Sequence, residues 1–258
     1  MRLLTHNNHT HTACVIATAA AFLLASSVHG GAQPRTVEAR GFVHVNGGFQ
    51  AASTDFTETI TFRSNGEDAS ATTAHAVDGS FLFDVSGGVF VSENLAVGAA
   101  VSRSSKDSDA AVSARLPHPF FFNNDRLVDG TQPASRTETA VHIQAQWFVP
   151  INDQIEVGVF GGPSFFSVEQ GFVRGVAFTD AFPFESATFV SAPTALQSES
   201  AVGFNAGADV MVFLTPNMGI GGLVRFSRAS VDFAAGDGGT QSLDAGGVQV
   251  GGGLRLRF

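Results

Sequence analysis

Several residue types are scarce in this sequence. It has no tyrosine, one cysteine and a single lysine, and only 14% of its 258 residues are charged. One cysteine cannot form an intramolecular disulfide, so the fold does not depend on one. The net charge is −9 and no basic stripe is present, which argues against nucleic acid as a partner. No apolar run reaches the roughly 20 residues that a membrane-spanning helix needs, so a helical membrane protein is not expected.

The longest apolar run lies near the N-terminus, at residues 13–25, and reads ACVIATAAAFLLA. It follows a polar segment whose only charge is Arg2, which is the order of regions in a secretory signal peptide. We therefore predict that residues 1–32 are a cleaved signal peptide and that residues 33–40 form a short lead. The three histidines within residues 6–12 would leave with this peptide, so no metal site is proposed there.

The C-terminal residues alternate between apolar and polar side chains. One face carries Leu254, Leu256 and Phe258, and the other carries Arg255 and Arg257. Because side chains of a strand point to alternate faces, one face can touch lipid while the other keeps its guanidinium groups in a polar interior. This pattern is typical of a transmembrane β-strand, although a soluble antiparallel strand would alternate in the same way.

A short motif occurs three times along the chain. It reads FVSENLAVG at residues 90–98, FVPINDQIEVG at 148–158 and FLTPNMGIG at 213–221. Each copy has an aromatic residue, an aliphatic residue, a short turn, and then a strand that opens with alternating aliphatic residues. Three turns of one design indicate three hairpins that close on the same side of a sheet.

The other connections are of a different kind. They are the tip SNGED at residues 64–68, the segments 114–134 and 171–197, and the smaller segment 234–239. With the three short turns they make seven connections, and seven connections join eight antiparallel strands. Short turns at one end and longer loops at the other are the layout of a small outer-membrane barrel.

The first strand changes its pattern along its length. Residues 41–51 place apolar side chains such as Phe49 at odd positions, whereas the continuation at 56–63 places Ile60 and Phe62 at even positions. If one face of the strand stays apolar throughout, the parity must change between the two parts. We therefore predict a bulge or irregular passage near Ser53.

By its PN, ND and EN turns, its glycine-rich strands and its terminal Phe258, the mature chain resembles the bacterial outer-membrane β-barrel domain family. This group of small eight-stranded barrels includes the OmpA-type and opacity-type proteins. One departure is the absence of tyrosine, which usually lies with tryptophan at the lipid interfaces. Phenylalanine must form that girdle here, with Trp147 near the periplasmic edge.

The resemblance implies an all-β fold: an antiparallel up-and-down transmembrane β-barrel of about eight strands over residues 41–258, with short periplasmic turns and longer extracellular loops. It implies the bacterial outer membrane as the location, with both termini in the periplasm and outer-membrane lipid around a monomeric barrel. It also implies that Leu254, Leu256 and Phe258 form the C-terminal signal read by the barrel insertion machinery.

The inward faces of the predicted strands carry a balanced set of charges. An eight-stranded barrel is just wide enough for side chains to fill it, so these groups can pair and plug the lumen. The alternative is a proton path or a gated narrow pore, in which His142 would be the titrating residue. The candidate interior residues are Asp84, His142, Glu156, Asp209, Arg225, Arg255 and Arg257.

No catalytic constellation is evident in the sequence. Some outer-membrane barrels act on lipid A, and they place a nucleophilic or polar set at the lipid-facing rim. The histidines of the mature chain are His44, His75, His118 and His142, and none stands in a His-x-Ser arrangement. We therefore propose no catalytic, cofactor-binding or metal-binding residue, although a Ser/His/acid set assembled from separate loops would not show in the sequence.

The longer loops are rich in phenylalanine. The segment LPHPFFFNN at residues 116–124 has three, and five more lie in the third loop, between residues 171 and 197. Exposed apolar clusters often mark contact surfaces, so these rings suggest a surface partner. The alternative is that strands continue above the membrane and the rings pack together there, which the strand-like segment 165–178 favours. The acidic pair Glu67 and Asp68 is a weaker hypothesis for a divalent-cation site.

Together these features predict an integral outer-membrane barrel that is not an enzyme and has a structural, adhesive or surface-interaction role. The alternative is a porin-like narrow channel or conduit for small or hydrophobic solutes. A soluble secreted barrel fits poorly, because the polar set would then lie outside and the large apolar faces would share a core that no helix covers.

Overall fold

The structure is a computed structural model that describes residues 40–51, 55–76, 79–235 and 238–258. The predicted signal peptide, nearly all of the lead, and Ser53 lie outside these residues. Within them, no helix is long and apolar enough to cross a membrane. They form strands β1 (Gly41–Gln50), β2 (Phe56–Ser64), β3 (Glu67–His75), β4 (Ser80–Phe90), β5 (Leu95–Pro117), β6 (Asp125–Pro150), β7 (Ile155–Val173), β8 (Ala177–Asp180), β9 (Ala187–Ser191), β10 (Thr194–Phe213), β11 (Met218–Ala234) and β12 (Thr240–Arg257).

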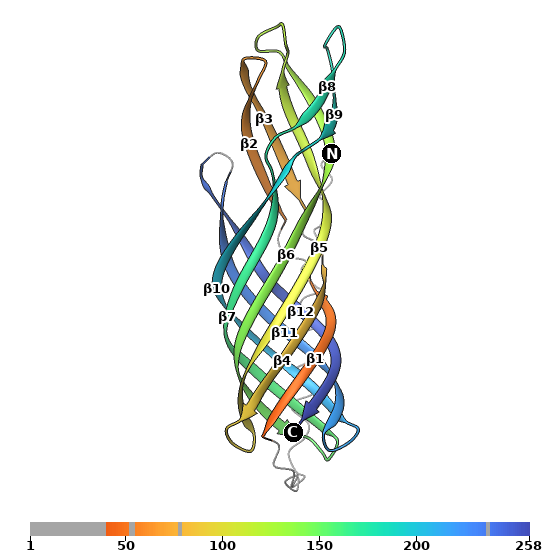
Figure 1. The fold of residues 1–258 in the computed structure, drawn as a ribbon, viewed down its shortest axis with the longest axis vertical. Helices are drawn as coiled ribbons and strands as arrows, with labels where there is room; N and C mark the ends of the chain where they lie inside the picture. Colours follow the sequence, from red (N-terminus) through yellow and green to blue (C-terminus); the bar gives the residue numbers. More distant parts are fainter. Residues whose placement is uncertain (1–39, 52–54, 77–78, 236–237) are drawn as a thin grey trace, which may run out of the picture. The chain divides into compact units, whose positions relative to one another are not determined.

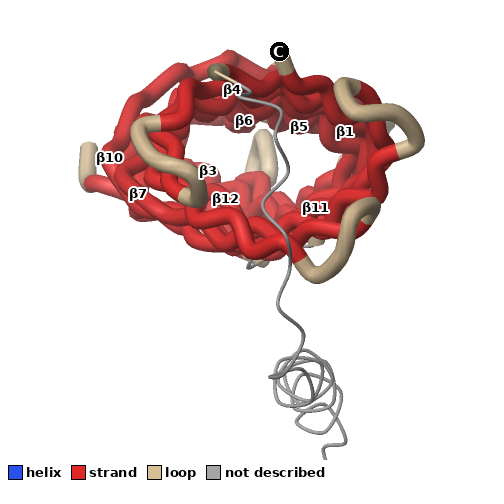
Figure 2. The backbone as a smooth tube through the Cα atoms, turned by 90° about the horizontal axis from the view of Figure 1, so that it is seen from below, coloured by secondary structure: helices blue, strands red, loops and turns tan. Residues whose placement is uncertain are grey.

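Eight of these strands form a closed antiparallel ring (Figure 1), and Figure 2 shows the ring end-on. Around the ring the order is β5, β4, β1, β12, β11, β10, β7 and β6, and β6 pairs back to β5. The two ends of the domain close it, because β1 pairs with β12 from Phe42↔Arg257 to Gln50↔Gln249. The predicted antiparallel barrel of about eight strands is confirmed.

The three repeated turns share one hydrogen-bond pattern. In each, the amide of the first turn residue donates to the carbonyl four positions later at 2.8–2.9 Å: Val91 to Leu95, Ile151 to Ile155 and Leu214 to Met218. All three lie at the same end of the ring as the C-terminus (Figure 1). The sequence repeat therefore corresponds to a structural repeat.

Strands β2 and β3 form a hairpin of their own beyond β1 and β4. β5 pairs with β4 as far as Phe81↔Ser105, and with β3 from Ala74↔Ala111 onward. The hairpin turns at Asn65 and Gly66, whose φ angles are 52° and 85°. Positive φ at both central residues suits the twist of a two-residue hairpin, so the predicted tip at residues 64–68 is present.

The segments 114–134 and 171–197 were expected to be long connections, and most of each is strand instead. β5 continues to Pro117 and β6 begins at Asp125, so the connection between them is short. β7 continues to Val173 and β10 begins at Thr194, with the small hairpin β8–β9 between them. The extra strand length prolongs the sheet beyond the ring (Figure 1).

The sheet has two regions with opposite polarity. On β5, the outward residues Val97 and Val101 are 46% and 49% exposed, whereas farther along the inward residues Val112 and Leu116 are buried. Odd-numbered residues face outward along the strand, but the apolar residues change from the outward to the inward positions. We call the region near the short turns the belt (residues 41–50, 80–105, 137–165, 202–228 and 247–258) and the rest of the described strands the extension (55–76, 106–136, 166–201, 229–235 and 238–246).

This inversion also corrects the expectation for the first strand. Gln50 on β1 and Ile60 on β2 are both buried, so even-numbered residues face inward in both strands. No change of parity occurs between them. The apolar residues move from the outer face in the belt to the inner face in the extension.

Three buried apolar clusters fill different levels of the interior. One lies near the short turns and includes Phe42, Phe148 and Phe213. A second, in the extension, includes Phe172 of β7 and Phe233 of β11. The third lies toward the long-loop end and consists of Ile60, Ala69, Ala71, Val112, Ala114, Leu116, Val128, Val173 and Ala192. Polar residues such as Asp84, His142 and Arg225 occupy the interior of the belt between the first cluster and the second, and we call them the polar layer.

Candidate functional site

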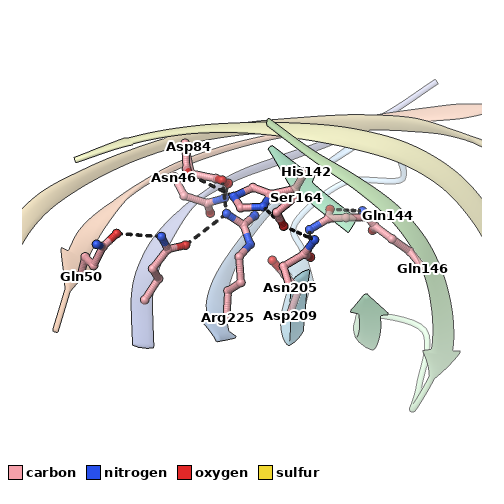
Figure 3. Close-up of polar contacts among 12 residues, drawn as sticks. Asn46, Gln50, Asp84, His142, Gln144, Gln146, Ser164, Asn205, Asp209 and Arg225 are labelled. Carbon is pink, nitrogen blue, oxygen red and sulfur yellow. Dashed lines mark hydrogen bonds and ion pairs between the residues drawn. The ribbon is translucent and has the colours of Figure 1, made fainter. Parts of the chain in front are cut away.

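The center of the polar layer is an ion pair between β11 and β4. Arg225 Nη1 lies 2.6 Å from Asp84 Oδ2, and both side chains are at most 1% exposed. Asn46 Nδ2 donates to the other Asp84 oxygen at 3.0 Å, and Arg225 also donates to Gln249 Oε1 at 3.3 Å. Figure 3 shows Arg225 reaching from β11 toward Asp84. Both charges are therefore paired and hydrogen-bonded, as buried charges must be.

Two further ion pairs join the C-terminal strand β12 to β10 and to β7, which are not its direct neighbours in the ring. Arg255 donates to both carboxylate oxygens of Asp209, from Nε at 2.9 Å and from Nη2 at 2.6 Å. This two-point contact fits the planar guanidinium to the planar carboxylate. Arg257 pairs with Glu156, and the rings of three phenylalanines lie 4.7–5.3 Å from its guanidinium carbon: Phe90, Phe148 and Phe213.

His142 lies between two serines. Its Nε2 is 3.0 Å from Ser102 Oγ, and its Nδ1 is 2.7 Å from Ser164 Oγ. Asn205 Nδ2 donates to the same Ser164 oxygen at 2.9 Å, and Gln144 Nε2 donates to Asn205 Oδ1 at 2.9 Å (Figure 3). The imidazole is fully buried, so these serines supply its partners in place of water.

The polar layer contains residues that the sequence set omitted. Gln50 Nε2 donates to Glu138 Oε2 at 2.9 Å, and Gln249 Nε2 donates to Gln50 Oε1 at 2.8 Å. Arg136 pairs with Glu138 at 2.7 Å. The inward parity of β1 was a signal for Gln50. No such signal marked Arg136, because the segment just before it was assigned to a loop.

All seven predicted interior residues thus lie inside the barrel, and six of them form three ion pairs. The geometry crosslinks β4 to β11, β10 to β12 and β7 to β12 through the lumen. The three residues of the predicted C-terminal signal lie on β12 and just after it. Leu254 and Phe258 are 53% and 67% exposed, and the Phe258 carbonyl accepts the amides of Arg40 and Gly41 at 2.7 and 2.9 Å.

At the other end, three hairpin tips are bonded into one unit, which we call the head (residues 62–69, 116–127 and 177–187). Asn65 of the β2–β3 turn donates to the Pro117 carbonyl at 2.9 Å. The amide of Asn123, in the β5–β6 loop, donates to Glu67 Oε1 at 3.3 Å. These two bonds tie the first tip to the second.

Arg126 ties the second tip to the third. Its Nη2 donates to the Pro117 carbonyl at 3.1 Å, and its Nη1 donates to Asp180 Oδ1 at 2.8 Å and to the Phe184 carbonyl at 3.3 Å. The side chain is 3% exposed, so its charge lies beneath the surface of the head. Its guanidinium carbon lies 5.9 Å from the Phe178 ring center. One arginine therefore braces the β8–β9 hairpin against the β5–β6 hairpin.

Seven of the eight phenylalanines of the two loops fall into two groups, and Phe184 is half-buried, between the two groups in exposure. Phe172 is buried, and Phe178 and Phe189 pack against the third apolar cluster, so these rings belong to the interior of the extension. The rings that remain on the surface are 60–87% exposed: Phe120, Phe121, Phe122 and Phe182. Both hypotheses for the phenylalanine-rich loops therefore describe part of them.

His118 shapes the loop that carries three of the exposed rings. Its Nδ1 accepts the amides of Phe120 and Phe121 at 3.1 and 3.2 Å, and the Phe121 ring lies 4.8 Å from the imidazole. The Phe120 ring also lies 5.3 Å from that of Phe184 in the neighbouring tip. The imidazole itself is buried, so the loop is held from below.

A family model described as "Outer membrane protein beta-barrel domain" matches residues 18–256. The chain belongs to this family. The exposed apolar side chains of the belt, such as Val97, Val159 and Ile220, therefore face lipid, and the protein is located in the bacterial outer membrane. Comparison with curated proteins gives no match.

Several solved outer-membrane barrels are similar in structure. Neisserial surface protein A has a TM-score of 0.42 at 12% identity, covering 84% of this chain and 97% of that one. OprG from Pseudomonas aeruginosa has a TM-score of 0.43 at 13% identity, covering 86% and 97%. The outer membrane protease OmpT from Escherichia coli has a TM-score of 0.42 at 7% identity, covering 88% and 100%. Likenesses this distant concern the fold and carry no information on activity.

In this outer-membrane barrel, a small cavity adjoins the polar layer on the side of the extension. Its volume is about 30 Å³, and residues such as Gln50, His75, Lys106, Glu138 and Gln170 line it. Buried waters need roughly 10–15 Å³ each on this measure, so the cavity has room for about two. It is too small for an organic substrate.

The belt and the extension offer no metal centre among their described residues, since no three histidine, cysteine or acidic side chains come close enough to hold an ion. The acidic tip has other partners: Asp68 pairs with Arg63 at 3.0 Å, and Glu67 accepts the Asn123 amide. The hydrogen-bonded set around His142 is fully buried, so a substrate has no access to its serines.

Proposed function

We propose that this outer-membrane barrel is a non-enzymatic scaffold that presents the head for binding outside the cell. In this proposal, the short turns and both termini face the periplasm and the head faces the exterior. The observation that carries it is a group of four strongly exposed phenylalanines on two of three hairpin tips that are hydrogen-bonded to one another.

The polar layer favours a scaffold role and argues against a role as a channel. Arg225 and Arg255 are among the largest fully buried side chains of the described residues, and each is paired with a buried aspartate. A solute moving along the axis would have to separate these pairs. Breaking such a pair leaves an uncompensated buried charge, at a cost of about 3–5 kcal/mol.

The hydrogen bonds of Arg126 and His118, which we call the brace, support a role in binding. Ordering a mobile loop on association costs free energy, and this cost falls when the loop is already held in its bound conformation. The Arg126 and His118 hydrogen bonds hold the aromatic loops before any partner arrives. Clusters of large exposed apolar groups also mark contact sites on other proteins.

The height of the head supports an external partner. From Val101, the last strongly exposed apolar residue of β5, the strand continues to Pro117. At a rise of about 3.3 Å per residue and a tilt of about 45°, the tip stands roughly 35–40 Å beyond the lipid boundary. The phenylalanines therefore cannot reach the membrane that holds the barrel.

The experiment compares bacteria that display equal amounts of two forms. The variant replaces Phe120, Phe121, Phe122 and Phe182 with serine, and the readout is retention on octyl-coated beads. We expect retention to fall several-fold, with the heat-dependent gel mobility of the folded barrel unchanged. A matched control replaces Val190 and Leu196, which are 57% and 69% exposed but lie outside the head, with serine, and should leave retention unchanged. Equal retention of wild type and the phenylalanine variant would overturn the proposal.

A further inference from the structure

The exposed phenylalanines of the head are edged by carboxylates. Asp125 directly follows the β5–β6 loop and pairs with Pro117 across the hairpin, and Glu185 directly follows Phe184. Both acids are exposed. Arg126 is next to Asp125 and donates to the Phe184 carbonyl at 3.3 Å, so the brace brings both acidic positions to the same part of the head.

Both arginines of the head pair with aspartates. Arg126 is buried, and its Nη1 and Nη2 donate to Asp180 and to two backbone carbonyls. Arg63, on the first tip, pairs with Asp68. Arg115 lies on the outer wall of β5 opposite Leu127. The surface around the four exposed rings therefore presents aromatic faces and carboxylates together.

We propose that the head binds a cationic, apolar peptide segment of another protein. This inference rests on the proposed function and adds the chemistry of the partner. Aromatic faces attract ammonium and guanidinium groups and pack against aliphatic side chains, and carboxylates at the rim of a contact pair with the same cations. The chain's net charge of −9 would also speed the approach of a basic partner.

Two other occupants fit the charges less well. A second copy of the head would bring Asp125 and Glu185 against the same acids, and like charges across an interface are unfavourable. An anionic membrane surface would be repelled by the same carboxylates. A basic peptide meets both the apolar and the acidic features of this surface.

The test uses the purified barrel in nanodiscs of zwitterionic lipid. The probe is a fluorescein-labelled 14-residue peptide of lysine and leucine in an amphipathic pattern, and its partner peptide has glutamate at every lysine position. Binding is followed by fluorescence anisotropy, with empty nanodiscs as the background. We expect the lysine peptide to bind at least about tenfold more tightly than the glutamate peptide, with an affinity that falls as salt rises.

Variants locate the binding. Asp125→Asn combined with Glu185→Gln should weaken lysine-peptide binding about fivefold, since exposed charge pairs contribute modestly. The matched control, Asp107→Asn combined with Asp109→Asn, removes the same charge from exposed positions on β5 below the head and should change affinity less than about twofold. The four-serine variant should abolish binding.

Equal affinity for the two peptides, or an unchanged affinity in the Asp125/Glu185 variant, would overturn this inference. The bead assay then decides the proposed function separately. If the phenylalanine variant still loses bead retention, the head is a binding surface for a partner of other chemistry. If the bead assay also shows no difference, the proposed function fails with the inference.

Discussion

Six strands (β5, β6, β7, β10, β11 and β12) run through both the belt and the extension with unchanged parity, yet the two regions are opposite in polarity. In the belt the outward residues are apolar and the inward ones carry the Asp84–Arg225 and Asp209–Arg255 pairs. In the extension the inward residues are apolar, as at Val112 and Phe172. The difference teaches that the surroundings, lipid in one case and water in the other, decide which face of a strand is apolar.

The two regions also differ in how they are closed. β10 pairs with β11 only from Phe204↔Arg228 toward the short turns, although β11 continues to Ala234. Beyond that point the described strands no longer form a complete ring. The gap is spanned by the second apolar cluster, where the Phe172 and Phe233 rings lie 5.2 Å apart. Hydrogen-bond closure and ion pairs therefore stabilise the belt, whereas apolar packing stabilises the extension.

The largest effect should come from breaking an ion pair of the belt. Arg225→Ala leaves the Asp84 carboxylate buried with Asn46 as its remaining partner, so we expect the free energy of unfolding to fall by about 3–5 kcal/mol. Urea unfolding in lipid vesicles measures the change. The control is Arg63→Ala in the extension, whose pair with Asp68 is exposed and should contribute at most about 1 kcal/mol. Equal losses in the two variants would contradict the difference between the regions.

A slightly smaller effect should come from removing one buried ring from the apolar interior of the extension. Phe172→Ala removes a fully buried ring and should cost about 3 kcal/mol. Because this ring bridges an incomplete part of the sheet, hydrogen exchange should rise in the extension and stay unchanged in the belt. The matched control is Phe182→Ala, at a site that is 87% exposed. Exchange that rises in both regions alike would show that they are one cooperative unit.

The brace of the head should have an intermediate, local effect. Arg126→Ala removes the bonds to Asp180 and to two carbonyls, which together should contribute about 2 kcal/mol. We expect limited proteolysis to cut the variant within residues 177–187 much faster than the wild type. Arg115→Ala, on the outer wall, serves as the control. Cleavage at the wild-type rate would mean that the β8–β9 hairpin is held by its apolar contacts alone.

The smallest effect should come from the exposed rings. Phe122 is 78% exposed, and Phe122→Ser should change the free energy of unfolding by no more than about 0.5 kcal/mol. The same urea titration checks this value. A larger loss would assign the ring to the packing of the head instead of to its binding surface.

The belt could be predicted from the sequence because its signals are local. Alternation of apolar and polar residues predicted each strand, and the three turn motifs predicted the short hairpin turns. The number of strands then followed from counting the connections. Segment 165–178 indicated strands above the membrane, but most of segments 114–134 and 171–197 was assigned to loops, and the reason is physical. The outward residues of the extension, such as Asp107, Asp109 and Ser113 on β5, are those of a water-exposed strand, and a composition rich in serine and aspartate is also typical of loops.

The candidate site was predictable in part. The inward parity of Asp84 and Arg225 followed from alternation, but the two residues are 141 positions apart. Which acid meets which arginine depends on the register of the whole ring, and no local pattern contains it. The same holds for Arg126, whose partners lie on a different hairpin. Its role required the extension to be known first.

The most direct test of the account is the conductance of the refolded mature protein in a planar lipid bilayer, measured beside the double variant Arg225→Ala, Arg255→Ala. If the ion pairs close the lumen and function belongs to the head, the wild type is silent and the variant opens a narrow conducting path. Steady conductance by the wild type would contradict the account, because the polar layer would then be a pathway and its residues the functional site.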